Sequence, residues 1–317
     1  MATDSALDDV VQAIRSHPGV RNKAPIALVT EVLGPADWYH GPGDDGAVVT
    51  DGDVTMVVGG EALWPPFAEA DPFGAGLAAV LANVNDLAAM GARPLAIVNT
   101  IVAREEVARR ALEGMRSGSA LYQVPIVGGH LTLHEGTPAI SAFGLGRAEQ
   151  VLSVRHAEAG QSLMVACATQ GTMRSDFPFF RSFDERGDRL AGDVRVLAQV
   201  AANGSCVAAK DVSMAGMIGS LVMLLEFSRL GVTVDLEALP RPDGVALGRW
   251  LTSFPCFAFL LCCPPGREEE CAEPFLDRGL DAAVVGQLDP SGEVRLRYGG
   301  EVATVFDMRS ETVTGLG

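Results

Sequence analysis

The chain has 317 residues, which suits two domains better than one, and 48% of them are hydrophobic, enough for buried cores. Its 40 acidic and 24 basic residues give a formal net charge of −16 without a basic tract, which argues against a nucleic-acid partner. No apolar run is long enough to cross a bilayer and the N-terminus is acidic and polar, so we expect a cytoplasmic protein with no membrane partner.

The first half of the chain alternates predicted helices and strands. An amphipathic helix is expected at 6–16, and a glycine-flanked turn containing Asp44 and Asp45 leads into a strand. The following pattern predicts a strand at 54–60, a buried helix at 74–91 that ends at a glycine, a buried strand at 95–102, an amphipathic helix at 105–122, and strands at 124–129 and 137–148.

A polar stretch at 148–161 marks the predicted domain boundary, which gives domains 1–150 and 151–317. The second half lacks a clean βαβ period, so we predict an α+β fold instead of a doubly wound sheet. None of the six cysteines forms a C-x-x-C pair, and we expect buried, reduced thiols. Predicted elements include a strand at 162–168, a polar and aromatic helical region at 174–202, a strand around residue 210 and a long helix from residue 214.

Carboxylates in unusual places suggest a cation site. Asp44 and Asp45 are adjacent and repel each other, so either a cation compensates them or they form an ordinary surface turn. Asp86 lies in a helix otherwise too apolar to face water, where a charge needs a metal or a structural partner. Asn83 lies three residues earlier, on the same helix face.

Other candidates stand at predicted strand ends. Glu61 follows two glycines that would let a phosphate or another backbone approach closely. Alternatively, Glu61 only marks the point where a strand leads into a loop. Gly128, Gly129 and His130 follow a strand, and backbone N–H groups of such a turn can hold phosphate oxygens. Asp211 precedes a long helix and is either a helix N-cap or a ligand.

Taken together in their order and spacing, these segments resemble a known superfamily. It contains AIR synthetase, thiamine-monophosphate kinase, selenide,water dikinase and a hydrogenase-maturation dehydratase. ANVNDLAAMGARP at 82–94 is the most specific match, and the resemblance covers essentially the whole chain. Further matching segments are GPGDDGAVV at 41–49, GGEALWPPF at 59–67, VGGH at 127–130, KDVSMAGMIGSL at 210–221 and AAVVGQL near the end.

This resemblance implies an N-terminal α+β domain that binds ATP and Mg²⁺ and dimerises through its sheet, followed by a C-terminal α/β domain. It implies a homodimer with ATP in a groove near the dimer interface. Magnesium ligands would fall on Asp44 or Asp45, Glu61, Asp86 and Asp211. Phosphate contacts would fall on Asn83 and on the Gly128–Thr132 turn, which includes Gly129, His130 and Thr132.

The expected activity is Mg²⁺-dependent phosphorylation or ATP-dependent activation of an oxygen atom in a small-molecule substrate, which is kinase-like or ring-closing chemistry. Glu61 stands where relatives have Asp, and Met214 where the thiamine kinase has a second Asp, which favours a non-catalytic nucleotide-binding dimer as the alternative. A metal-dependent phosphohydrolase is a second alternative. Lys23 is a loose match to a lysine of selenide,water dikinase. Arg174 or Arg181 either packs along a helix or binds an anionic substrate.

Overall fold

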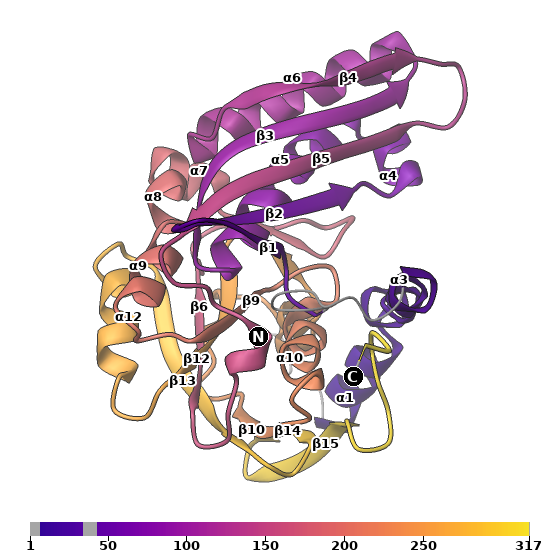
Figure 1. The fold of residues 1–317 in the computed structure, drawn as a ribbon. Coiled ribbons are helices and arrows are strands. Elements are labelled where there is room, and N and C mark those ends of the chain that lie inside the picture. Colours follow the sequence, from indigo (N-terminus) through magenta and orange to yellow (C-terminus); the bar gives the residue numbers. More distant parts are fainter. Residues whose placement is uncertain (1–6, 34–42, 317) are drawn as a thin grey trace. The chain divides into compact units, whose positions relative to one another are not determined.

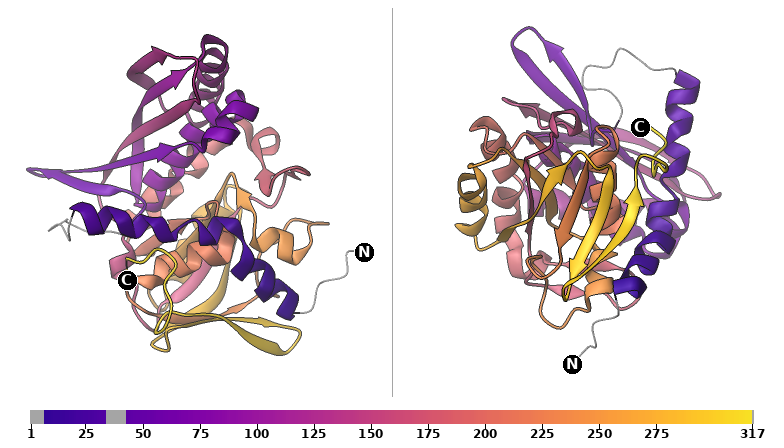
Figure 2. Two further views of the ribbon diagram at one scale, coloured as in Figure 1. Left: turned by 90° about the vertical axis from the view of Figure 1, so that its right-hand side faces the viewer. Right: turned by 90° about the horizontal axis from the view of Figure 1, so that it is seen from below.

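The computed structural model describes residues 7–33 and 43–316, and its contacts divide the chain into two compact units (Figures 1 and 2). Unit 1 contains the described residues up to Asp44, then 152–185 and 200 onward. Unit 2 contains 45–151 and 186–199. Both units combine sheets with helices, which confirms the predicted α+β class.

Unit 2 is built on a five-stranded sheet with the order β1-β2-β5-β3-β4. All neighbouring strands are antiparallel except β3 and β4, which are parallel and are joined by helix α6. Buried and exposed side chains alternate along β5, so one face of the sheet is packed and the other is open. The strands are β1 (Ala47–Asp51), β2 (Val54–Ala62), β3 (Ala92–Ala103), β4 (Ile126–Leu133) and β5 (Ala139–Ala148).

Helices α5 (Pro72–Ala89) and α6 (Glu105–Tyr122) cover the packed face of this sheet (Figure 1). The side chain of Asp71 caps α5 by accepting a hydrogen bond of 2.9 Å from the Gly74 N–H. Gly91, with φ of +72°, follows the helix and turns the chain into β3. Short helix α4 (Pro65–Ala70) precedes α5. The predicted helix and the capping glycine are therefore confirmed.

Residues 186–199 add a second segment to unit 2. The guanidinium of Arg186 forms a bidentate ion pair with Asp193, with both hydrogen bonds at 2.8 Å and both side chains buried. The guanidinium of Arg195 donates to the carbonyl oxygens of Tyr122 and Gln123, at the end of α6. The ion pair holds the segment together, and the Arg195 contacts attach it to the α6 end of the unit. It contains α8 (Leu190–Asp193) and the first part of α9 (Val196–Ala202).

Unit 1 is built on a seven-stranded sheet with the order β15-β14-β10-β13-β6-β12-β9. Its neighbouring strands are antiparallel except β10 and β14. Every residue of β6 and β12 is buried, as their continuous apolar sequences predict. The strands are β6 (Ser162–Cys167), β9 (Ala208–Asp211), β10 (Gly231–Asp235), β12 (Ala258–Cys263), β13 (Asp281–Asp289), β14 (Glu293–Tyr298) and β15 (Glu301–Asp307).

The first described helix, α1 (Leu7–Ser16), belongs to unit 1, whereas the predicted boundary placed it with the N-terminal domain. Its apolar face, including Leu7, Val10 and Ile14, lies in the hydrophobic core of unit 1, and the helix runs beside β15 (Figure 2). The polar stretch at 148–161 shows where the chain passes from one unit to the next. It does not show that α1, at the start of the chain, packs with the segments that follow this stretch. The other helices of the unit are α2 (Pro18–Arg21), α3 (Ala27–Leu33), α7 (Phe183–Arg186), α10 (Gly216–Glu226), α11 (Leu247–Leu251) and α12 (Glu268–Leu276).

The helical region predicted at 174–202 is wrong in its first part. Strands β7 (Thr172–Met173) and β8 (Phe179–Arg181) form a small sheet with β11 (Phe254–Pro255), and helical structure begins only at Phe183. In this small sheet the ring of Phe179 packs against that of Phe254, with the ring centroids 5.3 Å apart and the planes tilted by 46°.

The expectation of buried, reduced cysteines is confirmed, because all six are buried and free. Burial raises the pKa of the Cys262 thiol to about 12, which makes this thiol a poor nucleophile at neutral pH. Among the helices that the structure describes, none combines the length and hydropathy needed to cross a membrane.

Candidate functional site

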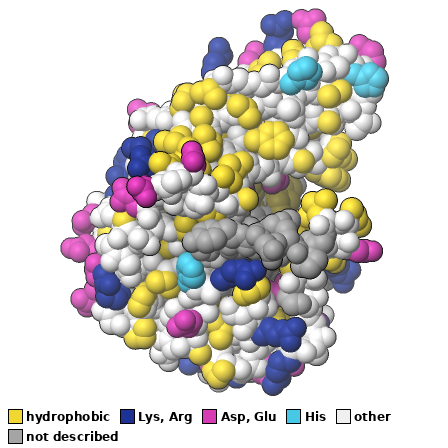
Figure 3. Space-filling view, in the orientation of Figure 1, with side chains coloured by type: hydrophobic (Ala, Val, Ile, Leu, Met, Phe, Trp, Pro, Cys, Tyr) yellow, Lys and Arg dark blue, Asp and Glu magenta, His cyan; other side chains and the backbone are white. Residues whose placement is uncertain are grey.

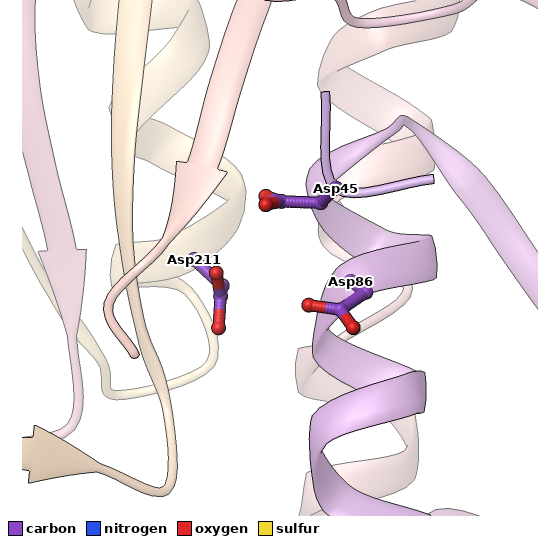
Figure 4. A group of neighbouring side chains, drawn as sticks. All are labelled: Asp45, Asp86 and Asp211. Carbon is purple, nitrogen blue, oxygen red and sulfur yellow. The ribbon is translucent and has the colours of Figure 1, made fainter. Parts of the chain in front are cut away.

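Asp45 and Asp86 bring two carboxylates together in unit 2 (Figure 4). Asp45 precedes β1 and Asp86 lies in the last turn of α5. Each offers an oxygen within 4.8 Å of the other, and both side chains are half-buried. Two ligands on opposite sides of one Mg²⁺ lie about 4.2 Å apart, so a single cation between these carboxylates fits the donor set with a small adjustment.

A glycine in β2 allows this approach. A Cβ added at Gly59 would lie 3.7 Å from the backbone oxygen of Asp45 and 4.0 Å from Cβ of Asp86. Gly59 therefore lies against both aspartates, and a larger residue would fill the space beside them. The prediction that glycines before Glu61 allow a close backbone or phosphate approach stays a prediction, because a Cβ at Gly59 would make only ordinary van der Waals contacts.

Asn83 fixes α5 on the sheet. Its side chain is fully buried, and its Nδ2 donates to the carbonyl oxygens of Ala79, at 2.8 Å, and Ala142, at 3.1 Å. The Ala142 carbonyl belongs to β5, so this amide ties the helix that carries Asp86 to the central strand of the sheet. Since both amide hydrogens are used within the fold, the structure gives Asn83 a positioning role and leaves no hydrogen for a phosphate.

Asp44 has a different environment from its neighbour Asp45. Its carboxylate accepts hydrogen bonds from the Ser153 hydroxyl, at 2.8 Å, and from the Val154 N–H, at 2.7 Å. These bonds hold the start of the short helix η2 (Val154–His156) in unit 1. The two adjacent aspartates therefore fall on either side of the division between the units, and only Asp45 takes part in the group with Asp86.

Glu61 lies on β2, opposite Ala142 of β5. It is two residues beyond Gly59, so it faces the same side of the sheet, the side that α5 covers. Among the described residues, Glu61 does not belong to the group of three or more carboxylates that includes Asp45 and Asp86.

The turn predicted at 128–132 is wrong, because these residues continue strand β4, and their predicted phosphate contacts stay a prediction. Gly128, Gly129 and His130 pair in register with Val98, Asn99 and Thr100 of β3. His130 and Thr132 lie on the same strand face, with His130 Nε2 and Thr132 Oγ1 separated by 3.3 Å. Gly129 allows β4 to lie close to β3, because a Cβ at this position would lie only 2.5 Å from the Asn99 carbonyl oxygen.

In unit 1, Asp211 ends β9, with its side chain only 3% exposed. Its Oδ1 lies 3.2 Å from the ammonium of Lys210, whose side chain is 4% exposed. Asp211 is not the N-cap of the following helix, which begins at Gly216 after Ala215. Met214 lies between them and is 43% exposed. Lys210 was not among the residues predicted from the sequence, although a lysine inside the apolar segment AAKDV is unusual enough to indicate a buried charge.

Arg174 and Arg181, the two candidates for binding an anion, each lie close to an aspartate. Arg174 forms two hydrogen bonds with Asp176, at 2.7 and 3.0 Å, and this pairing lowers the pKa of the Asp176 carboxyl to about 2. Arg181 lies 3.6 Å from Asp184. Lys23 is half-buried and precedes helix η1 (Ala24–Ile26) in unit 1.

Known proteins are similar to this chain in sequence and in fold. The family models of the AIR synthase related protein N-terminal and C-terminal domains match residues 43–148 and 157–299. An uncharacterized protein of Synechocystis sp. is 32% identical over 98% of both chains.

Solved structures share the fold of this chain. Thermotoga maritima PurL complexed with ATP matches with a TM-score of 0.75 and 19% identity, over 96% of this chain and 52% of PurL. AaThiL complexed with AMPPCP and TMP matches with a TM-score of 0.67 and 19% identity, over 89% of this chain and 96% of AaThiL. This chain thus spans about half the length of PurL. From both domain models and the full-length relative, the chain belongs to the AIR synthase related protein family.

Proposed function

We propose that this chain is a Mg²⁺-dependent enzyme that uses ATP to phosphorylate or activate an oxygen of a small molecule. The Asp45–Asp86 pair carries the proposal, because two half-buried carboxylates whose oxygens lie within 4.8 Å of each other are a suitable ligand pair for one divalent cation. The similarity to PurL and ThiL, whose structures contain ATP and AMPPCP, supports a nucleotide as the source of the phosphoryl group.

In this proposal Asp45 and Asp86 of unit 2 hold magnesium against the ATP phosphates, and Asp211 is a further magnesium ligand, as the family resemblance implies. Bound magnesium supplies charge neutralisation at the terminal phosphoryl group. The protein contributes positioning: Asn83 fixes the end of α5 on β5, and Gly59 keeps the space beside the carboxylates open. Glu61, on the same sheet face, remains a candidate further ligand.

The expected result of a thermal-shift experiment is that ATP together with Mg²⁺ raises the melting temperature, whereas ATP with EDTA does not. A ligand at about one hundred times its dissociation constant stabilises a protein by about 2.7 kcal/mol, which shifts the melting temperature by several degrees. Absence of any shift with Mg²⁺ and ATP would refute the proposal.

A single-turnover assay with ATP labelled at the γ-phosphate then separates the candidate functions. Transfer of label to a metabolite supports the enzyme. Tight Mg²⁺-dependent ATP binding with no transfer to any metabolite or to water favours a non-catalytic nucleotide-binding protein. Turnover of phosphate esters without ATP identifies a phosphohydrolase instead.

We further propose that the chain forms a homodimer through the open face of the unit 2 sheet. Hydrophobic side chains gather over this sheet (Figure 3), and Val58, Val98 and Phe143 are each about 40% exposed on this face. Phe143→Glu is expected to yield a monomer by light scattering coupled to gel filtration. The matched control is Leu112→Glu on α6, at 39% exposure, which should leave the dimer intact. A dimeric Phe143→Glu variant would exclude this face as the interface.

A further inference from the structure

Lys210 and Asp211 form a buried ion pair between neighbouring residues of one strand. The ammonium lies 3.2 Å from Oδ1 of Asp211, and the two side chains are 4% and 3% exposed. Successive side chains of a strand point to opposite faces, so the long lysine side chain must bend back around the strand to reach its neighbour. This contact is therefore made by a flexible chain on a strand at the end of the seven-stranded sheet.

Burying a carboxylate without a counter-charge is unfavourable in free energy, and this penalty destabilises the form of the protein that has no bound cation. An ammonium at one carboxylate oxygen supplies that counter-charge. A divalent cation bound to the same carboxylate takes over the role, and two cations at one carboxylate repel each other. The lysine and the metal thus compete for Asp211.

We propose that Lys210 is a built-in counter-ion that keeps Asp211 neutralised in the metal-free protein and is displaced when a divalent cation binds. This inference rests on the proposed function, in which Asp211 is a ligand of the ATP-bound magnesium. It assigns to Lys210 a positioning role that sets the affinity for the cation, because the protein must break the ion pair before Asp211 can bind the metal.

The test is Lys210→Met, a substitution of similar length without charge. The cation-free variant is expected to melt at a lower temperature than wild type, because Asp211 loses its ion pair with the Lys210 ammonium. The apparent dissociation constant for Mg²⁺, measured by thermal shift at saturating ATP, is expected to fall at least about threefold, because the competing cation is gone. Lys210→Gln keeps a hydrogen-bond donor and should likewise lower both the melting temperature and the apparent dissociation constant for Mg²⁺. It replaces the methionine variant if that variant does not fold.

The matched control is Arg186→Lys, which weakens a second buried ion pair, formed with Asp193 in unit 2. It should lower the melting temperature without changing the Mg²⁺ dependence. An unchanged or weaker Mg²⁺ affinity in the folded Lys210 variants would overturn the inference, while the wild-type response to Mg²⁺ and ATP would leave the proposed function standing. Loss of that wild-type response would refute the proposed function itself.

Discussion

Replacing Asp86 by asparagine is expected to abolish the stabilisation by Mg²⁺ and ATP while leaving the protein folded. Asparagine keeps the shape of the side chain and removes the negative charge that binds a hard cation. Asp86 is half-buried in the last turn of α5, and Asn83, one turn earlier, fixes the helix independently of this carboxylate. The apparent Mg²⁺ affinity should fall at least about 100-fold, equivalent to about 2.7 kcal/mol, with a comparable loss of turnover.

Two further substitutions make this result specific. Asp53→Asn removes an exposed carboxylate from the β1–β2 turn of the same unit and should change neither binding nor stability. Asp44→Asn weakens the cap on η2, so it should lower the stability by about 1 kcal/mol and leave Mg²⁺ binding unchanged. If Asp86→Asn binds Mg²⁺ and ATP like wild type, Asp86 is not a ligand.

The contrast between Asp44 and Asp45 shows what a sequence can predict about such a site. Both residues stand in the same glycine-flanked turn, and the sequence could not separate them. Their roles differ because Ser153, which is 109 residues further along the chain, donates a hydrogen bond to Asp44. Asp86 was identifiable because a charge in an apolar helix is unusual wherever that helix packs.

The same distinction applies to the fold. Helix α5 and the buried strands β6 and β12 follow from apolar patterns that are readable within a few residues. The Gly128–Gly129 pair carries a local signal for a turn, but its parallel pairing with β3 overrides that signal. The segment 174–182 was predicted as helical for a similar reason: Phe254, the ring partner of Phe179, lies in a strand far along the chain.

The largest expected loss of stability comes from Gly114→Ala, at the point where α5 and α6 meet. A Cβ at Gly114 would lie 2.0 Å from the carbonyl oxygen of Phe73, and one at Gly76 would lie 1.9 Å from that of Ala111. The two backbones therefore touch directly, and a methyl group forces the helices apart. We expect a loss of about 3 kcal/mol in the free energy of unfolding, measured by urea denaturation.

Gly128→Ala is the matched control, since a Cβ there meets no atom within 4 Å, and it should change the stability by less than about 0.5 kcal/mol. Because α5 carries Asp86, the displaced helix in Gly114→Ala should also weaken the response to Mg²⁺ and ATP, whereas the control should keep it. Equal stability of the two alanine variants would show that α5 and α6 do not approach as closely as the structure has them. Weakened Mg²⁺ binding in the control alone would instead direct attention to strand β4 as part of the nucleotide site.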